Sequence, residues 1–342
     1  MTTFQRVTDE LRATPRRWLI TGVAGFIGSN LLESLLGLDQ EVVGLDDLSM
    51  GKQANLDEVR DIVGPDRWRR FRFVRGDVAS PSTCKDAVAG VSTILHQAAL
   101  GSVPRSIESP LDSNHANVTG TLALLDAARH GGVRRFVYAS SSAVYGDSPQ
   151  LPKSEEHIGR PLSPYAVTKL ADELYADVFG QLHGIQAIGL RYFNVFGPRQ
   201  DPEGAYAAVI PRWIAAMIRG DEVHINGTGE TSRDFCYVRN VVQANLLAAV
   251  TEEAEAAGQA YNIADGNRTS LNELFDLLRT RLLPRHPALA SLKPSHGPFR
   301  AGDVLHSLAD IDKARRLLGY EPSHSIGQGL EEALPWYETH LG

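Results

Sequence analysis

A tyrosine and a lysine four residues apart, Tyr165 and Lys169 in the segment SPYAVTK, could together remove a proton from an alcohol. A phenol titrates near pH ~10 in water, so a tyrosine acts as a base at neutral pH only where a cation favours the phenolate. On a helix, positions i and i+4 share a face, which would place the Lys169 ammonium beneath the phenol and within reach of a bound ribose. Taken alone, this spacing is more typical of two surface residues, and the glycine-rich segment upstream reverses that interpretation.

That segment contains Gly22, Gly25 and Gly28, which follow the apolar run WLIT and open a helical pattern with G-x-x-G-x-x-G spacing. Such glycines permit a tight turn and let the backbone approach a pyrophosphate, while free N–H groups at the helix start attract the anion. The same residues would also fit an ordinary tight turn, but their strand-to-helix context favours dinucleotide binding. We expect the cofactor to contact this turn, including Phe26 and Ile27.

Asp46 ends the next apolar segment, EVVGLD. A carboxylate at this position can accept both ribose hydroxyls of an adenosine and would repel a 2′-phosphate, which favours NAD over NADP. Lys52, a few residues further on, could bind a 2′-phosphate, so NADP remains an alternative.

Five further residues in two segments complete this part of the predicted cofactor site. Asp77 ends the segment FRFVRGD, beside Val78, and could bond the adenine amino group or simply cap the strand. The small run Gln97, Ala98 and Ala99 follows the segment STILHQ and would allow close passage beside the cofactor, although small residues are also common in sheet cores.

Three serines, Ser140, Ser141 and Ser142, come at the end of the segment RFVYAS and directly after it, and they should lie at the carboxyl edge of a sheet, where doubly wound folds bind ligands. A serine cluster is also typical of a capped strand end. With Tyr165 and Lys169, however, it completes a set of groups that could deprotonate a carbinol while hydride leaves to a nicotinamide.

The elements that position these residues alternate from residue 17 between short apolar runs and helical patterns, which indicates successive βαβ units. We predict an α/β fold with a doubly wound parallel (Rossmann) sheet and a smaller α/β C-terminal substrate lobe. The predicted strands span residues 17–21, 41–46, 71–77, 92–97, 135–140 and 187–193, and the predicted helices include residues 31–38, 121–130 and 165–183.

We predict two domains with an uneven boundary. Residues 1–196 would form the NAD-binding domain, beginning with a short helix indicated by Phe4, Val7 and Leu11. Residues 197–342 would form the sugar-nucleotide lobe, with a segment of about residues 236–265 returning to the main domain.

Composition narrows the possible partners. The chain has 342 residues, a formal net charge of -7 and an estimated pI of 5.9, so it carries no basic footprint for nucleic acid. Its two cysteines, Cys84 and Cys236, are far apart and have no metal-ligand spacing, so we expect no bound metal. The polar N-terminus and the lack of a long apolar run favour a cytoplasmic protein without membrane contact.

Over essentially its whole length the chain resembles the extended short-chain dehydrogenase/reductase family. Within it, the chain is most similar to nucleotide-sugar 4-epimerases, especially the UDP-N-acetylglucosamine 4-epimerases of bacterial polysaccharide pathways. The resemblance is carried by GVAGFIGSN, HQAALGSVPRS, SSSAVYGD, SPYAVTK, LRYFNVFGPRQDP, GAYAAVIPRW, GETSRDFCYV and GDVLHSLAD.

The resemblance implies an isomerase in which Ser141 is the catalytic serine, Tyr165 the base and Lys169 its partner. Arg233 and Arg300 alone would be solvated charges, but a guanidinium fork suits bidentate phosphate binding. The positions that would hold UDP are Asn194, Ala208, Val209, Asn226, Arg233, Arg300 and Asp303, and those that would line the hexose pocket are Gly101, Ser102, Gln200 and Ser307, with Ser142 and Ala143 beside the catalytic serine.

Related dehydratases and decarboxylases carry an acid directly after the catalytic Ser/Thr or one residue later, where this chain has Ser142 and Ala143. Neither side chain can exchange a proton as a carboxylate does, so reversible oxidation at C4 remains. In the resulting hypothesis, Tyr165 takes the C4 hydroxyl proton, hydride moves to NAD, and the 4-keto sugar rotates about its diphosphate linkage before hydride returns. This requires strong contacts at the nucleotide and weak ones at the hexose.

By the same resemblance, Ser307 replaces a bulky tyrosine that would exclude an N-acetyl group, which favours interconversion of UDP-GlcNAc and UDP-GalNAc. Ala143 departs from the serine of many such relatives and could weaken the preference. UDP-glucose/UDP-galactose epimerisation stays open, as does UDP-uronic acid epimerisation with Arg105 as the cation. From another class, a non-catalytic NAD-binding regulator also stays open.

The resemblance also implies a homodimer. Helices around Asn117–His130 and Tyr165–His183 carry apolar faces that in this family pair across a two-fold axis into a four-helix interface.

Overall fold

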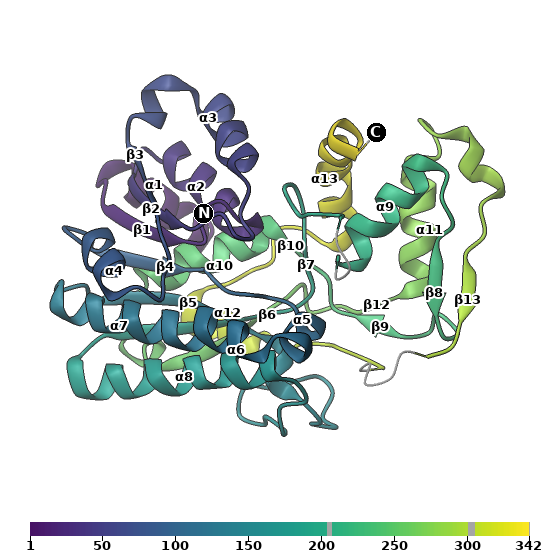
Figure 1. Ribbon diagram of the computed structural model, residues 1–342. Coiled ribbons are helices and arrows are strands. Elements are labelled where there is room, and N and C mark those ends of the chain that lie inside the picture. The colour runs from purple at the N-terminus through teal and green to yellow at the C-terminus, as the bar shows by residue number, and fades with distance from the viewer. Residues whose placement is uncertain (204–206, 300–304, 342) are drawn as a thin grey trace.

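A parallel sheet of seven strands forms the centre of the larger part of the computed structural model, which describes residues 1–203, 207–299 and 305–341 (Figure 1). The strand order is β3-β2-β1-β4-β5-β6-β11, and every neighbouring pair is parallel. This architecture confirms the predicted doubly wound α/β fold. The strands are β1 (Arg17–Thr21), β2 (Glu41–Asp46), β3 (Phe71–Arg75), β4 (Thr93–His96), β5 (Arg135–Ser141), β6 (Gln186–Tyr192) and β11 (Gln259–Ile263).

The direction of strand order reverses between β1 and β4, and the carboxyl ends of these strands define the crevice in which such folds bind ligands. The six predicted strands are all present, and their boundaries agree to within one residue except at the end of the third, which was predicted two residues too late. The third ends at Arg75, so Gly76 and Asp77 belong to the turn that follows. Glycine after the last paired residue favours such an exit from the ladder.

Helices cover both faces of the sheet, as alternation along the strands requires: Trp18 and Ile20 pack on one side and Leu19 on the other. The first face carries α1 (Thr3–Ala13), α2 (Phe26–Gly37), α3 (Gln53–Trp68), α10 (Val238–Val250) and α12 (Asp312–Leu318). The opposite face carries α4 (Pro81–Ala87), α7 (Gly120–His130) and α8 (Pro164–His183), with α5 (Val103–Glu108), α6 (Pro110–Asn114) and a π-helical turn (His115–Thr119) beside them.

The N-terminal helix α1 is present as predicted, and Val7 and Leu11 are buried against α10 and the first face. Its start is fixed by a capping box in which the Thr2 and Gln5 side chains bond each other's backbone N–H groups.

The smaller lobe has its own apolar core, which includes Trp213, Phe275 and Tyr337. Strand β11 pairs with β6 and therefore lies in the main sheet although it follows the first lobe segments; the domain boundary at residue 196 stays a prediction. The lobe contains α9 (Val209–Arg219), α11 (Leu271–Leu282) and α13 (Ile326–Leu341), and the short strand pairs β7 (Val195–Phe196) with β10 (Cys236–Tyr237), β8 (His224–Asn226) with β13 (Ser295–Gly297), and β9 (Ser232–Arg233) with β12 (Thr269–Ser270).

Across the described ranges, no helix combines the length and the apolar character needed to cross a membrane.

Candidate active site

The glycine turn connects β1 to α2 at the centre of the carboxyl edge of the sheet. Gly22 has a φ of 67°, a left-handed conformation that favours glycine, and a Cβ there would lie 2.8 Å from the Ala98 backbone nitrogen. A Cβ on Gly28 would lie 2.0 Å from the Gly22 carbonyl oxygen. Helix α2 begins after Gly25 without a side-chain cap. The first N–H groups of α2 therefore stay available to an anion such as a pyrophosphate.

Asp46 lies at the end of β2 beside this turn. Its carboxylate accepts the N–H of Ala24 at 2.9 Å and that of Leu48 at 2.8 Å. Burial raises the pKa of Asp46, and the two backbone hydrogen bonds oppose that shift. A Cβ on Gly51 would lie 2.8 Å from both carboxylate oxygens, so the missing side chain leaves room for a ligand at this carboxylate.

Asp77 and Gln97 already have protein partners. The Asp77 carboxylate accepts the Ala79 N–H at 2.8 Å, which is the strand-end cap that the sequence left open, while its other oxygen lies 3.4 Å from His115 Nε2. The Gln97 amide donates to Asn245 and accepts from a tyrosine hydroxyl, each at 3.1 Å. These contacts fix both side chains.

The predicted reacting groups come from β5 and α8. Ser141 is the last residue of β5, and its hydroxyl accepts the Ala143 N–H at 3.1 Å. Ser163 caps α8, so Tyr165 lies in the first turn of the helix, where its N–H donates to Ser106 Oγ at 3.0 Å. Lys169 lies one turn further on.

The Lys169 ammonium is buried. It donates to the Ala139 carbonyl oxygen at 3.0 Å and lies 3.1 Å from Asp172 Oδ2. Burial opposes the positive charge, but the Asp172 carboxylate and Tyr165 raise the pKa of Lys169 on balance. The sequence analysis missed Asp172, whose only signal was its position three residues after Lys169.

Asn117, in the π-helical turn, also went unrecognised as a positioning residue. Its amide accepts the Leu100 N–H at 2.8 Å and donates to Thr168 Oγ1 at 2.9 Å, so it joins the segment after β4 to α8. Such turns occur frequently at functional sites.

These elements surround one cavity of about 490 Å³, within the size range of sites for small molecules and cofactors. Its volume extends from the glycine turn to the reacting groups. Of the predicted site residues, those that line it are Gly22, Gly25, Phe26, Ile27, Gly28, Asp46, Asp77, Val78, Gln97, Ala98, Ala99, Gly101, Ser141, Tyr165, Lys169, Asn194 and Gln200.

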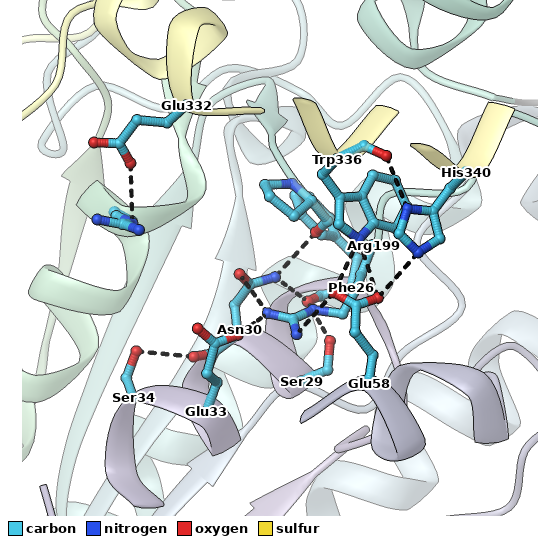
Figure 2. Close-up of polar contacts among 12 residues, drawn as sticks. Phe26, Ser29, Asn30, Glu33, Ser34, Glu58, Arg199, Glu332, Trp336 and His340 are labelled. Atoms are coloured by element: carbon cyan, nitrogen blue, oxygen red, sulfur yellow. Dashed lines mark hydrogen bonds and ion pairs between the residues drawn. The ribbon is translucent and has the colours of Figure 1, made fainter. Parts of the chain in front are cut away.

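Arg199 anchors the segment that carries Gln200. Its guanidinium is buried beside Asn30 and Glu33 of α2 and Glu58 of α3, and Glu58 also accepts the Trp336 indole N–H of α13 (Figure 2). The Gln200 amide donates to the Val195 carbonyl oxygen at 2.9 Å, and its buried Oε1 has no hydrogen-bond partner within the described ranges. This oxygen could accept a hydrogen bond from a ligand once the side chain turns toward the cavity.

Lys52 was considered from the sequence as a partner for a 2′-phosphate. It forms an ion pair of 2.7 Å with Asp201 at the cavity. The other lining cations in the described part of the chain, Lys169 and Arg199, are paired with carboxylates as well. A free cation for a 2′-phosphate is thus absent among these lining residues. The glycine turn, the open start of α2 and the Asp46 carboxylate together fit an NAD molecule.

Among the described residues, a second group of predicted substrate contacts does not line this cavity. Ser102 caps α5, Ala208 precedes α9, and Ser307 donates its N–H to the Ser232 carbonyl oxygen at 3.0 Å beside Arg233. Arg300 and Asp303 fall outside the described residues. The group outside the cavity lining comprises Ser102, Ser142, Ala143, Ala208, Val209, Asn226, Arg233 and Ser307.

The chain is similar to known proteins over most of its length. Residues 18–264 match the NAD dependent epimerase/dehydratase family. The UDP-glucose 4-epimerase of Mycolicibacterium smegmatis is 36% identical over 330 residues, covering 94% of this chain and 99% of that protein.

Two solved structures are similar to nearly the whole of this chain. A UDP-N-acetylglucosamine 4-epimerase from Methanobrevibacter ruminantium, in complex with UDP-N-acetylmuramic acid, superposes with a TM-score of 0.87 at 34% identity, covering 96% of this chain and 99% of that one. A UDP-glucuronic acid 4-epimerase from Bacillus cereus, solved with NAD and a fluorinated substrate analogue, gives a TM-score of 0.83 at 29% identity, covering 95% and 99%.

Proposed function

The chain belongs to the NAD-dependent epimerase/dehydratase family, and we propose that it inverts C4 of a UDP-hexose, preferably interconverting UDP-GlcNAc and UDP-GalNAc. NAD is its cofactor. The observation that carries the proposal is the single cavity that brings Ser141, Tyr165 and Lys169 together with the glycine turn and Asp46.

The bound NAD would supply an oxidant that accepts hydride from C4 and returns it. Tyr165 Oη would take the C4 hydroxyl proton and later return it, while Ser141 Oγ hydrogen-bonds the same sugar oxygen. The buried, charged Lys169 would favour the phenolate during this transfer.

The absence of a second acid supports inversion over elimination. In the described part of the chain, the carboxylates that line the cavity are Asp46, Asp47 and Asp77 after β2 and β3, and Asp201, which is paired with Lys52. A dehydratase would need a proton donor beside the reacting sugar, next to Ser141.

The preference for an acetylated sugar is supported by two residues. Gln200 lines the cavity, and its buried Oε1 has no hydrogen-bond partner among the described residues, so a turn of this side chain would let the oxygen accept the N–H of an N-acetyl group. By the family resemblance, Ser307 would supply a small side chain where a tyrosine would exclude an N-acetyl group, although Ser307 does not line the cavity described above. UDP-glucose and UDP-galactose would lose the amide hydrogen bond but would still fit, so we expect slower turnover of these sugars.

A uronic acid is less well supported. The cations that line the cavity within the described ranges are already neutralised by carboxylates. Arg105, the cation considered from the sequence, directs Nη1 toward Met50 Sδ at 2.7 Å and does not line the cavity. A non-catalytic regulator would not need the intact set of Ser141, Tyr165 and Lys169.

We also propose a homodimer that buries one face of α8. Val167, Leu174, Val178 and Leu182 recur at helical spacing and are exposed, with Leu174 at 62% and Leu182 at 72%. Helix α7 lies beside α8 on the same side of the sheet (Figure 1). A contiguous apolar face of this kind is typical of a protein interface.

The test is incubation of the purified protein with UDP-GlcNAc and UDP-Glc separately, with and without added NAD, followed by separation of the nucleotide sugars. We expect C4-inverted product from both and faster turnover of UDP-GlcNAc. Comparable rates would reject the acetyl preference alone. No inversion of either sugar by NAD-loaded protein would contradict the proposed reaction.

A further inference from the structure

A carboxylate lies on the buried face of α8, the predicted catalytic helix. Asp172 is three residues after Lys169 on α8, and its Oδ2 lies 3.1 Å from the ammonium. The two side chains are 1% and 2% exposed, respectively. The pair is therefore sealed between α8, α7 and the sheet, where water cannot substitute for either partner.

Among the described neighbours, Asp172 is the carboxylate in direct contact with Lys169, and Glu173 raises the pKa of Lys169 less than Asp172 does. The Glu173 carboxylate is bound by the Arg191 guanidinium at 2.8 and 2.9 Å and accepts the Ser140 hydroxyl. On β4, burial and the nearby Lys169 charge lower the pKa of His96 to about 3, so that side chain is neutral. Tyr138 of β5 faces the two α8 carboxylates, and burial raises its pKa, so it is neutral too.

The neutral His96 belongs to a buried chain that leads from the cofactor turn toward Asp172. The Ala98 N–H donates to Thr21 Oγ1 at 3.2 Å, and Thr21 Oγ1 lies 2.6 Å from His96 Nδ1. His96 Nε2 lies 3.0 Å from Thr121 Oγ1. Burial raises the pKa of Asp172, whereas Lys169 and the Thr121 hydroxyl beside it act in the opposite direction. The chain thus fixes a hydroxyl that favours the charged carboxylate.

We propose that Asp172 is a positioning residue that keeps the buried Lys169 ammonium charged and directed between β5 and the Tyr165 phenol. Its action on the reaction rests on the proposed function, whereas its action on Lys169 does not. Asp172→Asn would keep the side-chain size and remove the charge. The largest interaction that opposes the effect of burial on Lys169 would then be lost, and the pKa of Lys169 would fall.

The first test measures the free energy of unfolding by chemical denaturation at pH 7 and pH 10, without NAD or sugar. In the wild type the folded-state pKa of Lys169 is raised, so its stabilisation is fully present below the unfolded-state value near ~10.4 and is lost only above it. In Asp172→Asn the folded-state pKa falls below that value, so the stability of the variant rises with pH. The deficit relative to wild type should shrink to about half or less between pH 7 and pH 10.

The matched control is Asp177→Asn on the same helix, whose carboxylate is exposed and bonds Gln181 at 2.9 Å. It should show little deficit at either pH. A deficit in Asp172→Asn that is the same at both pH values would mean that Asp172 only packs, and it would overturn the proposal.

The second test compares turnover of the NAD-loaded enzyme at pH 9.5 and pH 7.5. For Asp172→Asn this ratio should fall about tenfold relative to wild type, because Lys169 loses its proton within the range. Asp172→Glu, which keeps the charge, should restore the ratio. An unchanged ratio in Asp172→Asn overturns the catalytic part of the inference, while inactivity of wild type and Asp177→Asn alike contradicts the proposed function and leaves the unfolding test to decide on Asp172.

If Asp172→Asn does not fold, the double variant that combines Lys169→Met with Asp172→Asn tests whether Asp172 acts by pairing the buried charge of Lys169. Removing both charges is far less destabilising than leaving one of them buried and unpaired. The double variant should therefore fold and unfold at a higher denaturant concentration than Asp172→Asn at pH 7. Failure of the double variant to fold overturns the proposal.

Discussion

Two buried cations lie at the same cavity and have different surroundings. Arg199 contacts α2 through Asn30 and Glu33, and α3 through Glu58, and Glu58 in turn binds α13 (Figure 2). Its two acidic partners are 33% and 23% exposed, and its Nε and Nη1 have no hydrogen-bond partner in the described part of the chain. Lys169 has one acidic partner, which is sealed from solvent.

This difference indicates two roles for a buried charge, one in holding the fold together and one in the reaction. Arg199 joins elements that are distant in sequence, so its removal should loosen the fold around the cavity. Lys169 joins a helix to the strand beneath it and has an electrostatic interaction with Tyr165, so its removal should act on proton transfer. The comparison holds if stability and activity respond separately to changes at the two sites.

The largest effect should follow Tyr165→Phe, which removes the hydroxyl next to Lys169 and leaves the ring. We expect epimerisation to fall about 1,000-fold, within the range for loss of a general acid–base group. The unfolding free energy and NAD binding should stay near wild type, because the backbone N–H of this residue makes the bond to Ser106. Turnover and fluorescence titration with NAD measure the two effects. Activity close to wild type would remove Tyr165 as the base.

Arg199→Met should show the converse pattern. Removing the guanidinium leaves two carboxylates without their cation, and we expect a loss of about 3 kcal/mol in unfolding free energy. The control is Arg219→Met, which breaks the exposed pair with Glu203 and should change stability by no more than about 1 kcal/mol. Equal losses in the two variants, measured by denaturation, would mean that Arg199 does not join these elements.

Asp234 extends the comparison to a buried carboxylate whose hydrogen bonds from the described residues all come from backbone N–H groups, those of Asp265, Gly266 and Ala309. Burial raises its pKa to about 7. The folded protein therefore binds a proton that the unfolded chain has released, so this stabilisation is fully present below about pH 4 and is lost as pH rises through 7. The unfolding free energy should fall with pH by at most about 1.4 kcal/mol per pH unit in this window. Asp234→Asn should make the unfolding free energy depend less on pH in this window. An unaltered pH dependence would mean that other groups cause it.

The smallest effect should come from the exposed pair of Lys52 and Asp201 at the cavity. Lys52→Gln should weaken NAD binding by no more than about fivefold at low salt, since exposed ion pairs contribute up to about 1 kcal/mol. The difference should disappear near 1 M salt, where screening is strong. A larger loss of NAD affinity that does not depend on salt would mean that this pair behaves like the buried ion pairs of Arg199 and Lys169.

Sequence patterns predicted the sheet well because each of its strands is a local run with one periodicity. The glycine turn, Asp46, Tyr165 and Lys169 were predictable for the same reason: each lies at a fixed offset from the strand or helix that presents it. The predicted strand end at Asp77 was wrong, because the end of this strand is set by its pairing with β2, which stops at Arg75.

The charged partners could not be predicted from local patterns. Arg199 and Glu33 are 166 positions apart, and the segment after β6 has no periodicity to suggest a buried guanidinium. Asp172 lies on a helix whose opposite face is solvent-exposed, so its burial depends on how α8 packs against α7 and the sheet. In the smaller lobe, strands of two or three residues are too short for any pattern to specify.

The most direct test of the account uses UDP-GlcNAc that carries deuterium at C4 of the sugar. Hydride that leaves and returns within one cavity predicts UDP-GalNAc with deuterium retained at C4, in ordinary water and without label elsewhere. Product in which C4 carries hydrogen from solvent, or in which the label lies at another carbon, would contradict oxidation and return at C4.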